Sequence, residues 1–172
     1  MFLVPLREFV DGPVVTDGRL PPTDEHLADV DFTLAEPVDV QGRLMETGPG
    51  RYYWDAQLGT RVLGSCRRCL APVTARVAPR VKVLLVEGED PDDPDAYVVP
   101  VRATELDLGD VIREELILAV PDFLVCRDDC RGLCAQCGAD LNQGPCDCRP
   151  EPDARWAALE ALKAARPDDP TE

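Results

Sequence analysis

The order of apolar and polar residues in the middle of the chain predicts β-strands. Residues 38–47 form the first expected strand and residues 51–65 the second, with a Gly-Pro-Gly turn between them. Gly59, inside the second strand, indicates a β-bulge. Residues 73–86 continue the alternation with apolar residues mainly at odd positions, and residues 97–101 form a further short strand. Half-buried alternation of this kind favours an antiparallel β-meander or a barrel-like sheet.

The hydrophobic period then changes to one that is typical of a helix. Residues 104–121 place apolar side chains at helical spacing, and Pro121 ends the pattern. We therefore predict an α+β fold in which one amphipathic helix covers the antiparallel sheet. A second, short helix is expected in residues 154–166, where Trp156, Leu159 and Leu162 form an apolar stripe.

The length of 172 residues suits one sizeable core and a small satellite. We expect residues 1–125 to form a β-rich core domain with its covering helix. Residues 126–165 are expected to form a Cys-rich, zinc-knuckle lobe together with the terminal helix, and residues 166–172 a disordered tail. The acidic, proline-broken residues 87–96 have the composition of a solvated loop.

Six of the eight cysteines lie within residues 126–148, which indicates a metal site. Cys134 and Cys137 are spaced so that two thiolates can chelate one tetrahedral ion, and Gly138 lets the backbone turn toward the sulfur atoms. We expect one cysteine from each neighbouring pair to complete that site, and Cys66 and Cys69 to be candidates for a second one. The expected ligands of structural Zn²⁺ are Cys126, Cys130, Cys134, Cys137, Cys146 and Cys148.

Other uses of the cysteines stay open at this point. Disulfides need an oxidising compartment and are usual in shorter chains. A thioredoxin-like redox centre places its CxxC at the start of a helix, whereas Cys69 is followed by Pro72 and a predicted strand. An iron–sulfur cluster also takes four cysteines. Because the spacing resembles zinc knuckles more than ferredoxin runs, we favour zinc.

The sequence shows no obvious catalytic constellation. Its one histidine, His26, lies in a polar N-terminal stretch and is expected to be a solvated surface residue. No Cys–His or Ser–His–Asp arrangement and no phosphate-binding glycine loop is evident. Catalytic zinc usually keeps an open position, so an all-cysteine site predicts a structural ion. We expect a protein that is not an enzyme and has no small-molecule substrate.

Neither a signal peptide nor a membrane span is expected. The N-terminal segment lacks a basic region followed by a long apolar run, and no stretch reaches the ~18 apolar residues of a membrane helix. The expected location is the cytoplasm, where reducing conditions keep cysteines available for metal.

The net charge of −15 is unevenly distributed. Residues 56–86 contain six basic side chains and no acidic one, so this stretch carries +6 and the remainder −21. Positions 76, 80 and 82 have the same parity and are expected to point outward together. Such a face is either a solvated surface or a phosphate-binding patch. The six residues of this basic patch are Arg61, Arg67, Arg68, Arg76, Arg80 and Lys82.

Four stretches together resemble the YceD family of large ribosomal RNA subunit accumulation proteins. They are SCRRCLAPV, LDLGDVIREELILAVP, CRDDCRGLCAQCGADLNQGPCDC and PDARWAALEALK, and the resemblance covers residues 38–163. It implies a non-enzymatic role in large-subunit rRNA accumulation or ribosome assembly, with a metal that supports the structure. The implied partner is large-subunit rRNA or a ribosomal or assembly protein, and on this basis we expect the basic patch to face RNA.

Two classes of function remain. The first is an assembly factor that contacts rRNA or a ribosomal protein. The second is a thiol-based redox or metal-handling protein that uses the arginine-flanked Cys66 and Cys69. A free-thiol titration separates them, because a structural site shields its thiols until a chelator is present.

Overall fold

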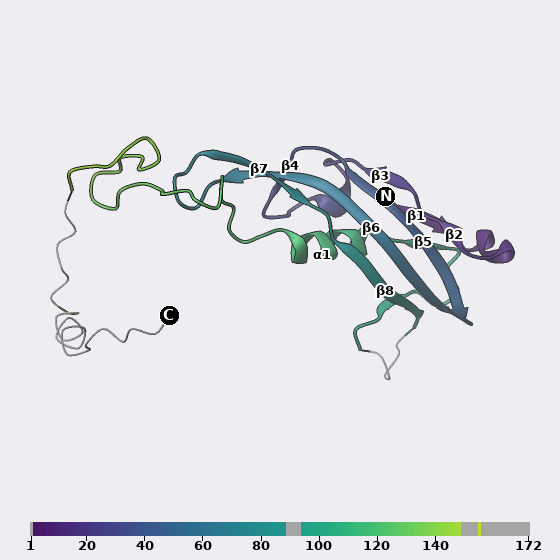
Figure 1. The fold of residues 1–172 in the computed structure, drawn as a ribbon. Helices are drawn as coiled ribbons and strands as arrows, with labels where there is room; N and C mark the ends of the chain where they lie inside the picture. Colours follow the sequence, from purple (N-terminus) through teal and green to yellow (C-terminus); the bar gives the residue numbers. More distant parts are fainter. Residues whose placement is uncertain (1, 89–93, 149–154, 156–172) are drawn as a thin grey trace, which may run out of the picture.

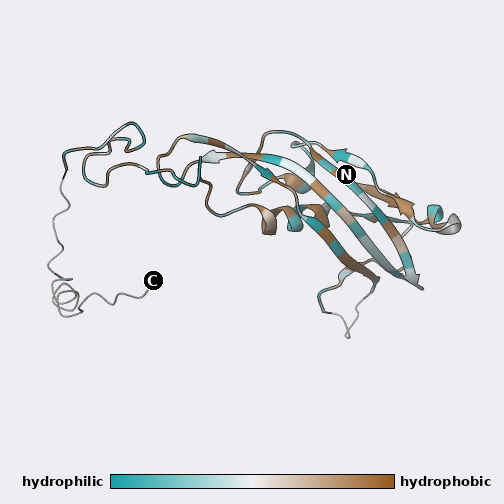
Figure 2. Ribbon diagram, viewed as in Figure 1, coloured by the Kyte–Doolittle hydropathy of each residue, from teal (hydrophilic) through white to brown (hydrophobic). Residues whose placement is uncertain are grey.

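The computed structural model describes residues 2–88, 94–148 and 155, and is built around one long β-hairpin (Figure 1). Strand β5 (Val38–Gly48) pairs antiparallel with β6 (Arg51–Ser65), as the sequence predicted. Hydrophobic and hydrophilic residues interleave along both strands (Figure 2). The register shift in this pair lies between Glu46 and Gly48. The bulge expected at Gly59 is therefore wrong, since Gly59 pairs in continuous register with Asp39.

The predicted strand 73–86 is two strands, which corrects the sequence interpretation. Strand β7 (Pro72–Val77) pairs with the end of β6, and β8 (Arg80–Glu87) pairs with its beginning. Residues 78–79 separate the two strands, and the Gln57 side chain donates to both of their carbonyl oxygens at 2.8 Å. Pro79 has no N–H for a ladder hydrogen bond, which explains the break.

The large sheet is open, so the expectation of a barrel is wrong. Its strands run in the order β2–β5–β6–β8–β9, and the outer strands β2 and β9 do not pair with each other. Strand β9 (Tyr97–Val99) lies parallel to β8, so the sheet is not a pure antiparallel meander.

The N-terminal residues, which carry no motif in the sequence, form several short elements that complete the sheet. Strands β2 (Val14–Val15) and β3 (Gly18–Leu20) pair with β5, and β4 (Thr33–Leu34) pairs with β6. Of two 3-10 helices, η1 (Leu6–Asp11) precedes β2, and η2 (Glu25–Leu27) lies between β3 and β4. A separate two-stranded ribbon joins β1 (Leu3–Pro5) to β10 (Glu105–Asp107).

Helix α1 (Gly109–Ala119) lies along one side of the sheet (Figure 1). Its Val111, Ile112 and Leu116 are buried in the same core cluster as Trp54 of β6. The Trp54 indole N–H donates to the Thr16 hydroxyl at 2.9 Å, which satisfies the buried polar group. Leu118, near the end of the helix, is 80% exposed.

Residues 126–148, here called the Cys-rich segment, follow α1. They lie beyond the β6–β7 turn, at the end of the sheet opposite the β5–β6 turn (Figure 1). The segment's one β-bridge within the described chain joins Leu133 to Asp140. The predicted terminal helix and tail lie outside the described residues, apart from Arg155. Among the helices that the structure does describe, none has the length and apolar character needed to cross a bilayer.

Candidate metal centres

The eight cysteines form two groups of four, and each group has the composition of a metal site. The sulfur atoms within each group all lie within 4.8 Å of one another. The first tetracysteine group consists of Cys66, Cys69, Cys126 and Cys130. The second tetracysteine group consists of Cys134, Cys137, Cys146 and Cys148.

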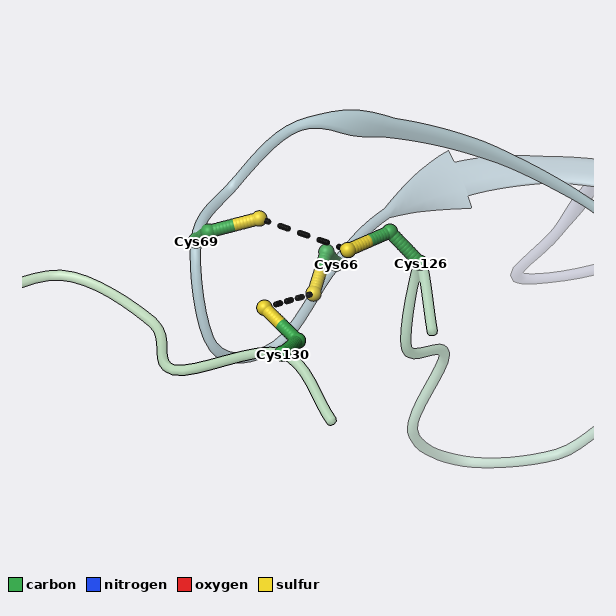
Figure 3. Close-up of side chains that lie close together, drawn as sticks. All are labelled: Cys66, Cys69, Cys126 and Cys130. Atoms are coloured by element: carbon green, nitrogen blue, oxygen red, sulfur yellow. Dashed lines mark hydrogen bonds between the residues drawn. The ribbon is translucent and has the colours of Figure 1, made fainter. Parts of the chain in front are cut away.

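The first tetracysteine group joins two distant parts of the chain (Figure 3). Cys66 and Cys69 lie in the turn between β6 and β7, and the other two lie in the segment after α1. The Sγ atoms of Cys66 and Cys130 are 3.8 Å apart, and those of Cys69 and Cys126 are 3.7 Å apart. Cys66 and Cys130 are buried, whereas Cys126 is exposed. The group is therefore a seam between the sheet and the Cys-rich segment.

Hydrogen bonds to backbone carbonyl groups also hold this seam, without the sulfur atoms. The Arg68 guanidinium donates to the carbonyl oxygens of Asp128 at 2.7 Å and Cys130 at 3.0 Å. The Arg68 carbonyl in turn accepts from the Leu133 N–H at 2.9 Å. Gly132 has a φ of +76°, and a Cβ at this position would lie 2.8 Å from the Arg68 carbonyl oxygen. Only glycine fits the close approach of the two backbones here.

The second tetracysteine group is built within residues 134–148. The turn at Cys134 is closed by hydrogen bonds from the Gly138 N–H to the Cys134 carbonyl and from the Cys134 N–H to the Ala139 carbonyl. Gly138 has a φ of +73°, the left-handed conformation that glycine tolerates. Asn142, within this stretch, contacts the first group, because its Nδ2 is 3.5 Å from the Cys130 Sγ. The two groups are thus neighbours along one short segment.

The thiols differ in how readily they ionise. Burial alone would raise the pKa of Cys66, but backbone N–H groups, including that of Cys126, outweigh it and lower this pKa to about 6. The N–H groups of Cys137 and Gln136 lower the pKa of Cys134 to about 6. By contrast, the hydrogen bond with Cys130, together with burial, raises the pKa of Cys126 to about 12. Four thiols this close together cannot all lose their protons unless a cation lies among them, because the negative charges of the thiolates repel one another.

The structure groups the cysteines differently from the simplest expectation. The sequence interpretation completed the Cys134 and Cys137 site with one cysteine from each neighbouring pair. In the structure, Cys146 and Cys148 both join that site. Cys126 and Cys130 instead lie with the hairpin-tip pair. The sequence held one sign of this grouping, because its eight cysteines form four close pairs, the number needed for two sites of four ligands.

The residues of the predicted basic patch do not form one uniform surface. Arg76 is exposed and lies opposite Arg61 in the β6–β7 register, while Arg80 and Lys82 are exposed on β8. The Arg67 guanidinium lies 3.7 Å from the centre of the Phe123 ring, a cation–π contact. Arg68 is engaged with the carbonyls of the first tetracysteine group. Two of the six residues thus have local partners in the seam.

His26 is not the solvated surface residue that the sequence suggested. Its side chain is only 11% exposed, and a Cβ at Gly109 would lie 2.5 Å from its ring. Its Nδ1 is 2.8 Å from Asp24, and its Nε2 is 3.2 Å from Asp107. Burial alone would lower the pKa of His26, but the hydrogen bond with Asp24 and the charges of Asp107 and Asp110 raise it above 6.5. The ring therefore ties η2 to the start of α1.

Fold and site together define a β-rich protein whose open sheet is joined to a Cys-rich segment through one of two tetracysteine groups. The family described as "Large ribosomal RNA subunit accumulation protein YceD" matches residues 54–163, more than half of the chain. The chain belongs to the YceD family.

The similar proteins come from bacteria and from plant chloroplasts. An uncharacterized protein of Mycobacterium tuberculosis is 36% identical over 100 residues, which cover 56% of this chain and 48% of the relative. The chain thus spans about half of that relative's length. The chloroplastic YCED homolog 1 of Arabidopsis thaliana, named a large ribosomal RNA subunit accumulation protein, is 35% identical over 45% of this chain and 27% of its own. Its Zea mays counterpart is 26% identical over 78% of this chain and 58% of its own. No solved structure matches the chain.

Proposed function

We propose that the protein is a non-enzymatic factor that supports the accumulation of large-subunit ribosomal RNA and carries two structural zinc ions. The spacing of the sulfur atoms in the first tetracysteine group is the observation that carries the zinc assignment. Zn–S bonds of ~2.3 Å in a tetrahedron separate the sulfur atoms by about 3.8 Å. The separations in this group are 3.8 Å for Cys66–Cys130 and 3.7 Å for Cys69–Cys126.

The composition of both groups supports a structural role for the ion. Four thiolates complete a tetrahedral shell, whereas catalytic zinc keeps a position for water or substrate. An ion in the first group would fix the β6–β7 turn to the segment after α1, and an ion in the second would fold residues 134–148. None of the eight cysteines is in a disulfide, so each can bind zinc as a thiolate, and a reducing cytoplasm would keep them in this state.

The role in rRNA accumulation rests on membership of the YceD family, and charge supports a contact with RNA. Arg61 and Arg76, which face each other across two strands, are both exposed. A concentration of cations on a chain with a net charge of −15 suits a polyanionic partner at that surface. We propose that the basic patch contacts large-subunit rRNA. A ribosomal or assembly protein would be the partner of the acidic remainder.

Co-purification from cells tests this function. A tagged full-length chain is recovered, and the bound RNA is sequenced; we expect enrichment of large-subunit over small-subunit rRNA. In a second arm, Arg76, Arg80 and Lys82 are all replaced by Gln, and the enrichment should fall. The matched control replaces Arg7, Arg102 and Arg131 by Gln, which makes the same change of charge elsewhere. Equal recovery of both rRNAs by the unmodified protein would refute the proposed function.

A thiol-based redox or metal-handling role is the second candidate, because backbone N–H groups lower the pKa of Cys66 and favour its thiolate form, although the side chain is buried. Titration of the purified, metal-loaded protein with a thiol reagent distinguishes the roles. Structural zinc should shield the thiols until a chelator is added. Immediate reaction of two thiols, with the metal still bound, would favour the redox role.

A further inference from the structure

The face of the large sheet that α1 does not cover, here called the open face, carries side chains of the kinds that bind ligands. Along β6 the even-numbered residues are buried in the core, and the odd-numbered ones face the other way. Helix α1 belongs to the core side, because Val111 and Ile112 share the core cluster with Trp54. Tyr53, Asp55 and Gln57 therefore lie on the face that α1 leaves open.

Register brings residues from several strands into rows across this open face. One row is charged and consists of Val15, Arg43, Asp55 and Lys82. The next row toward the β5–β6 turn is apolar and aromatic and consists of Met45, Tyr53 and Leu84. The row on the other side of the charged one is rich in amides and consists of Gln41, Gln57 and Arg80. Cations, amides and an aromatic ring are thus adjacent on one surface.

A hollow of about 790 Å³ lies in this face. Its lining includes apolar Val15 and Met45, the amides of Gln41 and Gln57, and the guanidinium groups of Arg43 and Arg80. The volume falls in the ~300–1,000 Å³ range of small-molecule and cofactor sites. Asp17 and Asp55 also line the hollow, whereas Tyr53 and Lys82 lie beside it in the rows of the sheet. The face is therefore concave and chemically mixed next to Arg43.

Two acidic groups of the face pair with arginines, and Asp17, in the lining of the hollow, accepts a hydrogen bond from the Gly42 N–H at 3.2 Å. Asp55 accepts two hydrogen bonds from Arg80, at 3.2 and 3.0 Å, and the bond from Arg80 lowers the pKa of Asp55. Asp39 pairs with Arg19 at 2.6 Å. Arg43 and Lys82 flank Asp55 in the register but make no ion pair with any residue that the structure describes. These two cations are available to a ligand.

We infer that the open face binds unpaired RNA, with phosphates on Arg43 and Lys82 and a base against Tyr53. This inference rests on the proposed function and specifies the form of RNA that is bound and the residues that bind it. Duplex RNA turns its bases inward and offers mainly phosphates and sugars, so it would leave Tyr53 and Met45 uncovered. An unpaired strand offers both a phosphate chain and exposed base faces, which stack on aromatic side chains.

The site differs from the basic patch that the sequence suggested. It adds Arg43 of β5 and Tyr53 of β6, which both lie outside the basic stretch of residues 56–86. Tyr53 is also uncharged. It does not include Arg67 or Arg68, which have local partners at the seam. Arg80 stays on the face but is shared with Asp55.

Direct binding by the metal-loaded, full-length protein tests the inference. The probe is an unstructured RNA of about 12 nucleotides, within the ~4–16 nucleotide size of single-strand sites, compared with the same sequence annealed to its complement. Fluorescence anisotropy should show tighter binding of the single strand. Tyr53→Leu should weaken single-strand binding about fivefold or more and leave duplex binding unchanged, whereas Tyr53→Phe should retain both.

The cations are tested separately. Replacing Arg43 and Lys82 by Gln should weaken single-strand binding and lower the slope of log affinity against log salt by about 1.4, or ~0.7 for each phosphate that is no longer neutralised. The control replaces Arg7 and Arg102 by Gln and should change neither the affinity nor the slope beyond a small amount. Thermal unfolding of each variant verifies that the fold is intact.

The outcomes separate this inference from the proposed function. Equal affinity for single strand and duplex, or full binding by folded Tyr53→Leu, overturns the inference, even if large-subunit rRNA still co-purifies. Binding of the single strand through Tyr53 and Arg43 supports the inference, even if co-purification shows no preference for large-subunit rRNA.

Discussion

The sulfur atoms of Cys66 and Cys130 lie 3.8 Å apart, although 64 positions separate the two residues in the chain. This contact fixes the tip of the β6–β7 hairpin to the segment that follows α1. The Arg68 guanidinium reinforces the same contact from the hairpin side by donating to the Cys130 carbonyl. The hairpin tip is thus part of the Cys-rich segment in space, while it belongs to the sheet in sequence.

Replacing both Cys66 and Cys69 by Ser should remove one of two equivalents of zinc. The remaining pair, Cys126 and Cys130, offers only two thiolates, which hold zinc much less tightly than four. Elemental analysis of the purified variants measures the loss. Replacing Cys134 and Cys137 by Ser should remove the other equivalent and leave the first group loaded. Unchanged metal content in the Cys66 and Cys69 variant would contradict the grouping of the cysteines.

Removing the metal with a chelator should loosen residues 126–148 while the sheet persists. The described part of this segment has a single β-bridge, Leu133 to Asp140, whereas the sheet has a core that includes fully buried Trp54. Binding of the ion and folding of the segment are therefore linked, and the sheet is independently stabilised. Hydrogen exchange followed residue by residue should show lost protection after residue 125. Equal protection with and without chelator would count against a structural ion.

Gly132→Ala should disrupt the first tetracysteine group more than Gly138→Ala disrupts the second. The two glycines have similar φ angles, +76° and +73°, so both substitutions carry the same conformational cost of about 1 kcal/mol. Only at Gly132 would the new Cβ meet a backbone atom, the Arg68 carbonyl at 2.8 Å; at Gly138 nothing lies within 4 Å. Zinc affinity from chelator competition should therefore fall further for Gly132→Ala. A similar fall in both variants would mean that the contact with Arg68 does not matter.

His26 should stabilise the fold at low pH more than at high pH. Its folded-state pKa is raised above 6.5, so its contribution is fully present below that value and is lost as the pH rises through the folded pKa. The difference in free energy of unfolding between the unmodified protein and His26→Gln should shrink as the pH rises from about 6 to 8. Denaturant unfolding across this range measures it. A difference that does not vary with pH would show that the charge of His26 is not used.

The long strands were predictable because the order of their own apolar and polar residues indicates a strand. In β5 and β6, alternating burial leaves a period of two in the sequence, and the predicted starts at Val38 and Arg51 match the structure. The place of α1 was predictable for the same reason, since its buried residues recur at helical spacing. The start of the predicted helical stretch was wrong, because residues 105–107 form strand β10 and pair with β1. The break at residues 78–79 was missed, because the alternation resumes in phase and Pro79 was the one local sign of it. The N-terminal strands of two or three residues are too short to carry a period at all.

By itself, the sequence determined which parts this protein has: strands with one buried side, a helix after the sheet, eight cysteines in close pairs and a basic stretch in an acidic chain. The tertiary structure alone decided which of these parts meet. Sulfur pairing across 64 positions, the position of His26 between three carboxylates and the row from Arg43 to Lys82 all depend on how distant segments pack. Which side chains of a strand or helix are buried follows from the order of apolar and polar residues within a short stretch, so it can be predicted from that stretch. Register and the docking of one segment on another depend on the summed energy of many long-range contacts, so no short stretch records them.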